Sequence, residues 1–441
     1  MGLEKENLII KRFGAIDDIN LDLTPIMVFI GGQATGKSTT AKLIAIFRAW
    51  KFILNSMTFE QLLVHYGISS YLSEDSYIKF TSALFDFEFL NGVGKIIEKE
   101  HEFHKKRSTY VEHKKKHNKS YPESSEEKPL LNRTAEIDLL LSTLDKEKDA
   151  KKIEELKNER EVKQNAINSI RIIDKAFTDY AGALFKAENY SEYIPAERTF
   201  LPSALGSFMN LQINKVPLPE NLLYFGAEFE KARNNFKEKS FDIDILGVKY
   251  KYENNEDRIY ISEKKYIHLK ESSSGFQALI PLLLAIHYKT TSDIMPHTYI
   301  VEEPELNLFP STQKELVRIL IDKCTQLNAY SNTVNELVIT THSPYILTSL
   351  NNQLFANRTA LKRLNKTEEI EKIIPKNFWI DAKNFSAYYF VAGGIKNIVN
   401  EKTGLIFETQ LDRTSEEINC EYDALMNIYK GDNKEIRESK N

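Results

Sequence analysis

The pattern of apolar and polar positions predicts several short strands and helices at the start of this chain. Alternation predicts strands at residues 7–13 and 19–23, and the continuous apolar run at 26–30 predicts a buried strand. Apolar residues then recur at helical spacing, which predicts a helix over residues 38–52. A strand, a glycine-rich turn and a helix therefore follow one another.

The same reading of the second half predicts alternating strands and helices. A strand meander is expected at 241–269, a helix at 274–288, a strand at 298–301, a helix at 311–327 and a strand at 336–340. Alternation of this kind is typical of a parallel sheet. We predict an α/β fold with a mostly parallel sheet and additional antiparallel β segments.

A highly charged stretch interrupts the globular pattern. Between residues 95 and 175 apolar positions keep heptad-like spacing only in fragments, on both sides of a polar break at 117–128. This predicts a helical hairpin insertion; a solvated surface insertion without a role is the alternative. We expect four parts: an N-terminal lobe (1–94), the insertion (95–175), a C-terminal lobe (176–350) and a small C-terminal segment (351–441).

Composition narrows the class of protein. The 441 residues are 42% hydrophobic and 28% charged, as in a globular protein, and the net charge of −4 does not predict a nucleic-acid or membrane surface. Cys324 and Cys420 lack the clustered spacing of a zinc site or a disulfide framework. No apolar run approaches the roughly 18 to 20 residues that span a bilayer, and the first residues lack a signal-peptide core. We expect a cytoplasmic protein without a membrane partner.

The strongest motif lies between the predicted strand at 26–30 and the helix that follows. It fits G-x-x-x-x-G-K-[ST] through Gly31, Gly32, Gln33, Ala34, Thr35, Gly36, Lys37 and Ser38, with Thr39 next. Backbone amides of such a loop cradle phosphates, because glycine lets the chain approach the oxygens closely. We expect ATP here, with Lys37 at the β and γ phosphates and Ser38 on Mg²⁺. A chance glycine-rich turn would not need the flanking strand and helix.

A second motif places two carboxylates at the end of an apolar strand. Glu302 and Glu303 are adjacent, so their side chains point to opposite sides and can divide the work. We expect Glu302 to hold the Mg²⁺ shell, where most P-loop proteins carry Asp, and Glu303 to polarise the attacking water. An acidic strand end followed by Pro304 is the plainer alternative.

Two further motifs complete the candidate site. His342, at the end of the strand at 336–340, is placed to hydrogen-bond the γ phosphate, although a lone histidine is often structural. Ser274, Gly275 and Gln277 stand at a helix start, where hydroxyl and amide groups bind anions or simply cap the helix.

The order of these motifs resembles the ABC-type ATPases of the SMC, RecF and OLD group. Ser274 and Gly275 match the serine and first glycine of their signature, and Phe276 replaces its second glycine. The acidic and histidine motifs look most like OLD-type ATPases, including the ATPase subunits of the Septu and PARIS phage-defence systems. The resemblance implies ATP and Mg²⁺ as cofactors and a head-to-head homodimer or higher homo-oligomer, in which each signature contacts the γ phosphate bound by the opposite subunit.

The end of the chain departs from many OLD proteins, which continue into a Toprim nuclease with a D-x-D metal site. Residues 345–441 contain no D-x-D. We therefore expect the ATPase alone, without nuclease activity, controlling a separate nuclease effector in phage defence, with DNA as a possible partner. The alternative is a RecF-like or SMC-like ATPase of DNA repair or chromosome maintenance. An ABC transporter subunit would fit the motifs but not the insertion.

Two single residues keep two interpretations each. Phe13 could stack on adenine or pack in the core. Arg198 could contact phosphate or DNA, or pair with a nearby carboxylate.

Overall fold

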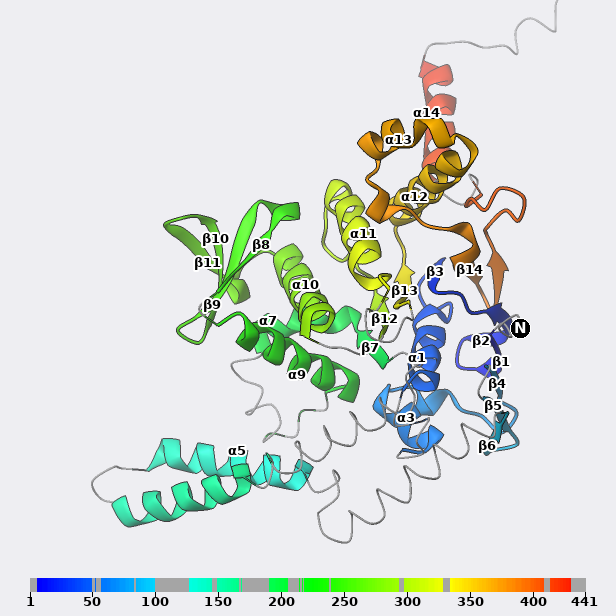
Figure 1. Cartoon of the computed structure of the whole chain (residues 1–441). Helices are drawn as coiled ribbons and strands as arrows, with labels where there is room; N and C mark the ends of the chain where they lie inside the picture. The colour runs from blue at the N-terminus through cyan, green and yellow to red at the C-terminus, as the bar shows by residue number, and fades with distance from the viewer. Residues whose placement is uncertain are drawn as a thin grey trace, which may run out of the picture.

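A six-stranded sheet forms the centre of the protein in this computed structural model (Figure 1). The structure describes residues 6–49, 52, 57–82, 85–99, 127–144, 149–165, 168, 190–204, 214, 216, 218–237, 239–292, 297–327, 334–407 and 413–429. The order of the central strands is β15-β14-β3-β13-β12-β7, and only β15 runs antiparallel to its neighbour. Their bounds are β3 Ile26–Gly31, β7 Tyr190–Ile194, β12 His297–Glu302, β13 Glu336–Thr341, β14 Phe385–Val391 and β15 Gly394–Asn397.

The central sheet separates two hydrophobic cores. All six residues of β3 are buried, because both faces of the sheet are covered. Val28 and its neighbours two residues away pack into one core, whereas Met27 and Phe29 pack into the other. This alternation follows from the two-residue period of a strand. This strand leads into the P-loop, the motif of residues 31–38, and is therefore held in place from both faces.

One core is closed by a five-stranded antiparallel sheet of order β2-β1-β4-β5-β6. Helices α1 (Lys37–Phe47) and α3 (Phe59–His65) contribute to the same core. The strands are β1 Asn7–Phe13, β2 Ile16–Asp22, β4 Tyr77–Thr81, β5 Phe85–Leu90 and β6 Val93–Glu98. β6 crosses residue 94, which was expected to end the N-terminal lobe.

The other core lies between the central sheet, several helices and a four-stranded antiparallel sheet of order β11-β10-β9-β8. These strands are β8 Ser240–Ile243, β9 Val248–Glu253, β10 Glu256–Ser262 and β11 Lys265–His268. The helices that contribute to this core are α7 Leu201–Ala204, α9 Glu220–Asn235, α10 Ser274–Ser292, α11 Pro310–Cys324 and α12 Pro344–Lys362. Two further helices, α13 Thr367–Ile373 and α14 Arg413–Tyr429, follow α12 in the sequence.

A pair of helices projects from the body (Figure 1). It consists of α5 (Glu127–Thr143) and a helix over residues 150–165, joined by the ion pair of Arg133 with Glu159 at 2.9 Å. A helical hairpin is therefore present, but its turn lies between these two helices. The predicted turn was the polar break at 117–128, where α5 already begins at Glu127; residues 101–126 lie outside the described part.

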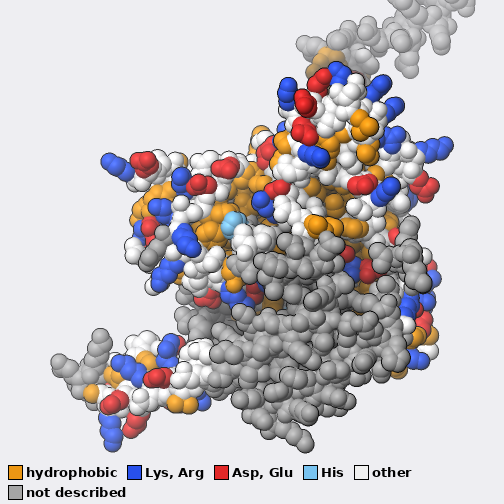
Figure 2. Space-filling view, in the orientation of Figure 1, with side chains coloured by type: hydrophobic (Ala, Val, Ile, Leu, Met, Phe, Trp, Pro, Cys, Tyr) orange, Lys and Arg blue, Asp and Glu red, His pale blue; other side chains and the backbone are white. Residues whose placement is uncertain are grey.

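The parallel sheet and the antiparallel meander were predicted correctly, although some boundaries differ. The helix expected over residues 38–52 ends at Phe47. Residues 351–441 were expected to form only a small segment, yet their strand β14 is a parallel neighbour of β3 in the central sheet. No helix in the described ranges has the length and apolarity to cross a membrane. On the coloured part of the face in Figure 2, acidic and basic side chains are interspersed.

Candidate nucleotide site

The P-loop connects β3 to α1 with a backbone that requires glycine at two positions. Gly31 has φ 152°, and a Cβ there would lie 2.3 Å from the carbonyl oxygen of Phe390 in β14. Gly36 has φ 98°, and a Cβ there would lie 2.6 Å from Cγ1 of Ile16. The loop is therefore pressed between β14 and β2 at its two ends.

Between these glycines, the loop faces outward at the start of α1. Gly32, Gln33 and Ala34 are exposed, and the Thr35 hydroxyl donates a hydrogen bond of 2.9 Å to the Gly32 carbonyl. Ser38 is half-buried in the first turn of the helix and Thr39 is buried. Helix N-terminal amides attract anions, so the turn has the form of a phosphate site.

Lys37 is held within its own loop. Its Nζ donates hydrogen bonds of 3.0 Å and 2.6 Å to the carbonyls of Gly31 and Gly32, and the residue is 5% exposed. Burial lowers the pKa of Lys37, and the nearby carboxylates of Glu303, Glu305 and Glu302 oppose this effect. The carboxylates of the acidic motif therefore lie close enough to the P-loop lysine to influence its charge.

The acidic motif begins at the end of β12. Glu302 is 4% exposed, and its Oε1 has no hydrogen-bond partner among the described residues. Burial and the Glu302 charge raise the pKa of the Tyr193 hydroxyl well above its usual value. An uncompensated buried carboxylate oxygen is costly, so this atom fits a cation ligand.

Glu303 occupies an unusual backbone conformation. Its φ is 41°, in the left-handed region that a residue with a Cβ rarely adopts. Its N–H donates a hydrogen bond of 2.9 Å to the carbonyl of Thr340 in β13. Its Oε1 lies 3.3 Å from Nε2 of His342. Strain of this kind clusters at functional sites and persists only when neighbouring contacts hold it.

Glu305 was not predicted as a site residue, yet its carboxylate holds the histidine loop, residues 341–343. Its Oε1 accepts hydrogen bonds of 2.7 Å from the Thr341 hydroxyl and of 2.7 Å from the His342 N–H. Burial raises the pKa of this carboxyl, although the two donors lower it. Next along the chain, the Ser343 hydroxyl donates 2.6 Å to Gln313 Oε1 and caps α12. The backbone that carries His342 is thus tied down from both sides.

The signature residues begin α10. Ser274 is exposed, whereas Gly275 packs so closely that a Cβ would lie 2.8 Å from the carbonyl oxygen of Asn307. The Gln277 amide donates hydrogen bonds of 3.0 Å and 3.1 Å to the carbonyls of Lys270 and Ser272. In this structure Gln277 therefore stabilises the turn before the helix, while Ser274 faces outward.

Burial decides between the two interpretations of Phe13, whereas Arg198 follows neither of those considered for it. Phe13 is fully buried and packs edge-to-face on Tyr71, with ring centroids 6.0 Å apart, so it belongs to the core. Arg198 is also fully buried, and each hydrogen bond found for it goes to a backbone carbonyl. Neither interpretation considered for Arg198, a contact with phosphate or DNA or a pair with a carboxylate, describes these bonds.

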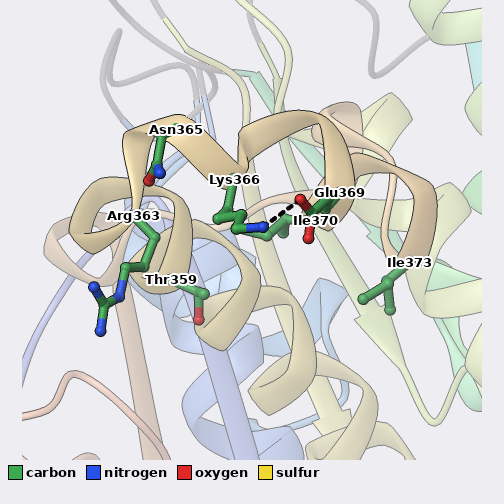
Figure 3. Close-up of a pocket in the computed structure, with 7 residues that line it drawn as sticks. All are labelled: Thr359, Arg363, Asn365, Lys366, Glu369, Ile370 and Ile373. Atoms are coloured by element: carbon green, nitrogen blue, oxygen red, sulfur yellow. Dashed lines mark hydrogen bonds and ion pairs between the residues drawn. The ribbon is translucent and has the colours of Figure 1, made fainter.

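A cavity also lies away from the four motifs. A cavity of about 310 Å³ between α12 and α13 is lined by Thr359, Arg363, Asn365, Lys366, Glu369, Ile370 and Ile373 (Figure 3). None of these residues belongs to the four motifs. Across the described ranges, no group of three or more His, Cys, Asp or Glu side chains is arranged to hold a metal by itself.

Comparison with known proteins bears on this geometry. Residues 213–347, which include the signature, the acidic motif and the histidine loop, match the family model described as AAA ATPase domain. This segment of the chain is therefore similar to an AAA ATPase domain. The P-loop lies before the matched segment, and the carboxylates of the acidic motif within that segment act on the pKa of Lys37. No curated protein matches the chain.

Solved structures with some likeness include two head domains. One is the Smc head domain with an extended coiled coil, bound to the C-terminal domain of ScpA, from Pyrococcus furiosus; it is 12% identical, with coverage of 94% of this chain and 98% of that one and a TM-score of 0.32. The other is the SMC head domain from Thermotoga maritima, 9% identical, with coverage of 90% and 98% and a TM-score of 0.36. Similarity at this level does not indicate a function for this chain.

Proposed function

We propose that this chain is an ATPase of the ABC type, which hydrolyses Mg·ATP between two copies of the chain. The observation that carries the proposal is the 3.3 Å approach of Glu303 to His342, together with the effect of the Glu303 charge on the pKa of the P-loop lysine. A carboxylate and an imidazole at this place can orient water and contact a γ phosphate. The strained backbone of Glu303 supports a catalytic role over a purely structural one.

Binding should begin with the loop of residues 31–39. Phosphate oxygens would replace the carbonyls of Gly31 and Gly32 as partners of Lys37, because a charged oxygen is the stronger acceptor for an ammonium group. Ser38 and Glu302 would hold Mg²⁺, and the unpartnered Glu302 Oε1 fits this role. The cation, when bound, neutralises charge on the β and γ phosphates.

For hydrolysis, Glu303 accepts a hydrogen bond from the attacking water and orients it toward the γ phosphate. His342 donates to a phosphate oxygen through its imidazole, and Glu305 holds its backbone in place. Ser274, Gly275 and Gln277 form the signature that closes the ATP site of the opposite copy. The exposure of Ser274 at the start of α10 supports this contact across the dimer.

The role in the cell that we propose is that of a cytoplasmic, OLD-like sensor in antiviral defence, similar to the ATPase subunits of Septu and PARIS systems. ATP-bound and hydrolysed head dimers would hold and release a separate nuclease, because a partner follows a conformational change only if it binds the two states unequally. The projecting helical hairpin offers a surface for that partner or for DNA. The absence of a D-x-D sequence after Pro344 supports an output other than nuclease activity of its own.

The test compares the purified chain with Lys37→Ala. The wild-type protein should bind Mg·ATP in calorimetry, shift to a dimer in light scattering when ATP is added, and release phosphate. Lys37→Ala should lose ATP affinity by about 100-fold or more, since its ammonium group is the main charge on the β and γ phosphates. Unchanged affinity in a folded variant would contradict the site.

The cellular role needs a different observation. A nuclease gene beside this one, and loss of phage protection with Lys37→Ala in cells, would support the defence role. A neighbouring permease gene, or a DNA-damage phenotype without a phage phenotype, would contradict it.

A further inference from the structure

Arg198 connects three segments that are far apart in the sequence. It lies in the short 3-10 helix Ala196–Phe200 that follows β7. Its Nε donates 3.0 Å to the Ala278 carbonyl in α10, and its Nη1 donates to the carbonyls of Pro195 at 3.0 Å and Glu302 at 2.6 Å. Its Nη2 donates 2.9 Å to the carbonyl of Glu303. One guanidinium therefore holds both α10 and the acidic motif.

The same two elements also touch directly. Gly275, in the first turn of α10, leaves no room for a Cβ beside the carbonyl of Asn307 in the loop after the acidic motif. Asn307 itself has φ 58°, so this loop is sharply bent at the contact. A displacement of the start of α10 would therefore meet the backbone of the acidic loop as well as Arg198.

We propose that Arg198 is a positioning residue, which holds Glu303 in its strained conformation and couples it to the signature helix of the same chain. This inference rests on the proposed function. Closure of the dimer presses on Ser274, α10 moves as a rigid element, and Arg198 carries that movement to the backbone of Glu303. The water-orienting carboxylate then reaches its working position only when a second copy is docked.

The chemistry of the side chain fits this role. A guanidinium offers several donors in a fixed plane, so it can serve carbonyls from different segments at once, whereas a lysine ammonium has one centre. Burial lowers the pKa of Arg198 to about 10, and the nearby carboxylates of Glu305, Glu302 and Glu303 oppose the shift. The group therefore stays charged near neutral pH, which strengthens each of its hydrogen bonds.

The experiment measures binding and turnover separately in Arg198→Lys and Arg198→Gln. Both variants should bind Mg·ATP within about three-fold of wild type, because Arg198 makes no bond to the P-loop among its described contacts. The kcat should fall by about 100-fold with KM nearly unchanged. Arg233→Lys is the matched control. Arg233 of α9 is also largely buried but pairs with Asp257, so the kcat of this variant should equal that of wild type.

The outcomes separate this inference from the proposed function. If wild-type protein neither binds nor hydrolyses ATP, the proposed function fails, whatever Arg198 does. If wild type is active and both Arg198 variants keep kcat within about three-fold, the positioning role is wrong. It is also wrong if neither variant yields a head that binds ATP, since Arg198 would then be required for the fold itself.

Discussion

Nε2 of His342 lies 3.3 Å from Oε1 of Glu303, and the two residues come from neighbouring parallel strands. The carboxyl ends of β12 and β13 meet at the same edge of the sheet, which is where ligands bind in open α/β folds. Each residue is anchored by another group: the N–H of Glu303 by Thr340 and the N–H of His342 by Glu305. Hydrogen bonds of the two backbone N–H groups therefore fix the positions of both residues, in addition to the contact between their side chains.

Replacing Glu303 by Gln should separate binding from chemistry. The amide keeps the size of the side chain but cannot accept a proton, so kcat should fall by about 100-fold or more while ATP still binds. The ATP-bound dimer should accumulate in light scattering. Glu315→Gln, on the exposed side of α11, is the control and should leave turnover unchanged. Turnover within a few-fold of wild type for Glu303→Gln would mean that another group orients the water.

Placing an arginine at Ser274 tests the contact between the two copies. Ser274→Arg should abolish hydrolysis yet leave ATP binding to single heads nearly intact, because the residue is exposed and lies outside the P-loop. Mixing it with Lys37→Ala should restore part of the activity, since one of the two shared sites then carries both defects and the other neither. No recovery in mixed dimers whose formation is demonstrated would argue against shared sites.

Glu305 should make stability depend on pH. Its pKa is raised in the folded state, so the contribution of Glu305 to the free energy of unfolding is fully present below its unfolded pKa and is lost as the pH rises through the folded pKa, by about 1.4 kcal/mol for each unit of elevation. Glu305→Gln keeps an acceptor for the Thr341 hydroxyl and His342 N–H but has no charge to bury. Its melting temperature relative to wild type should therefore rise between about pH 5 and about pH 8.

The control for this measurement is again Glu315→Gln, which should follow wild type at both pH values. Glu305→Ala is the opposite case, because it leaves both donors unpaired and should cost about 1–3 kcal/mol. If Glu305→Gln and wild type respond identically to pH, the carboxyl is not the buried, costly group described above.

The hairpin should be separable from the ATPase. Deleting residues 127–165 with a short linker should preserve ATP binding and hydrolysis, because the pair of helices projects from the body (Figure 1). Binding to a partner nuclease or to DNA should weaken, as pull-down and gel-shift assays would reveal. The intact chain, incubated with plasmid, linear DNA and RNA in Mg²⁺ or Mn²⁺, should cut none of them. Cleavage that co-purifies with the protein and survives Glu303→Gln would contradict this prediction.

Local patterns predicted the parts of the fold that depend on local chemistry. The bounds of β1 and the order of β12, α11 and β13 follow directly from apolar spacing. The sheet that contains β4, β5 and β6 was missed, although Phe85, Phe87 and Phe89 alternate with polar residues ahead of an Asn-Gly turn, which is a hairpin signal. The sequence pattern was therefore sufficient to predict this hairpin.

The role of Arg198 could not have been predicted from the spacing of residues in the sequence. Its acceptors are backbone carbonyls at Pro195, Ala278 and the acidic motif, and a carbonyl carries no sequence signature. Glu305 was visible in the sequence, but only the fold brings its carboxylate to the His342 N–H. Motif spacing thus identifies groups that act on the ligand, whereas groups that hold those residues depend on tertiary contacts.

The position of β14 has a consequence for synthesis of the chain. β3 lies between β13 and β14, whose residues follow it by some three hundred positions or more. Until the ribosome has released both later strands, β3 has two open edges, and an unpaired apolar strand is prone to aggregation. The carbonyl of Phe390, against which Gly31 packs, arrives last. A nascent chain should therefore gain its nucleotide site only after residue 391 has emerged, and chaperones would have to shield β3 until then.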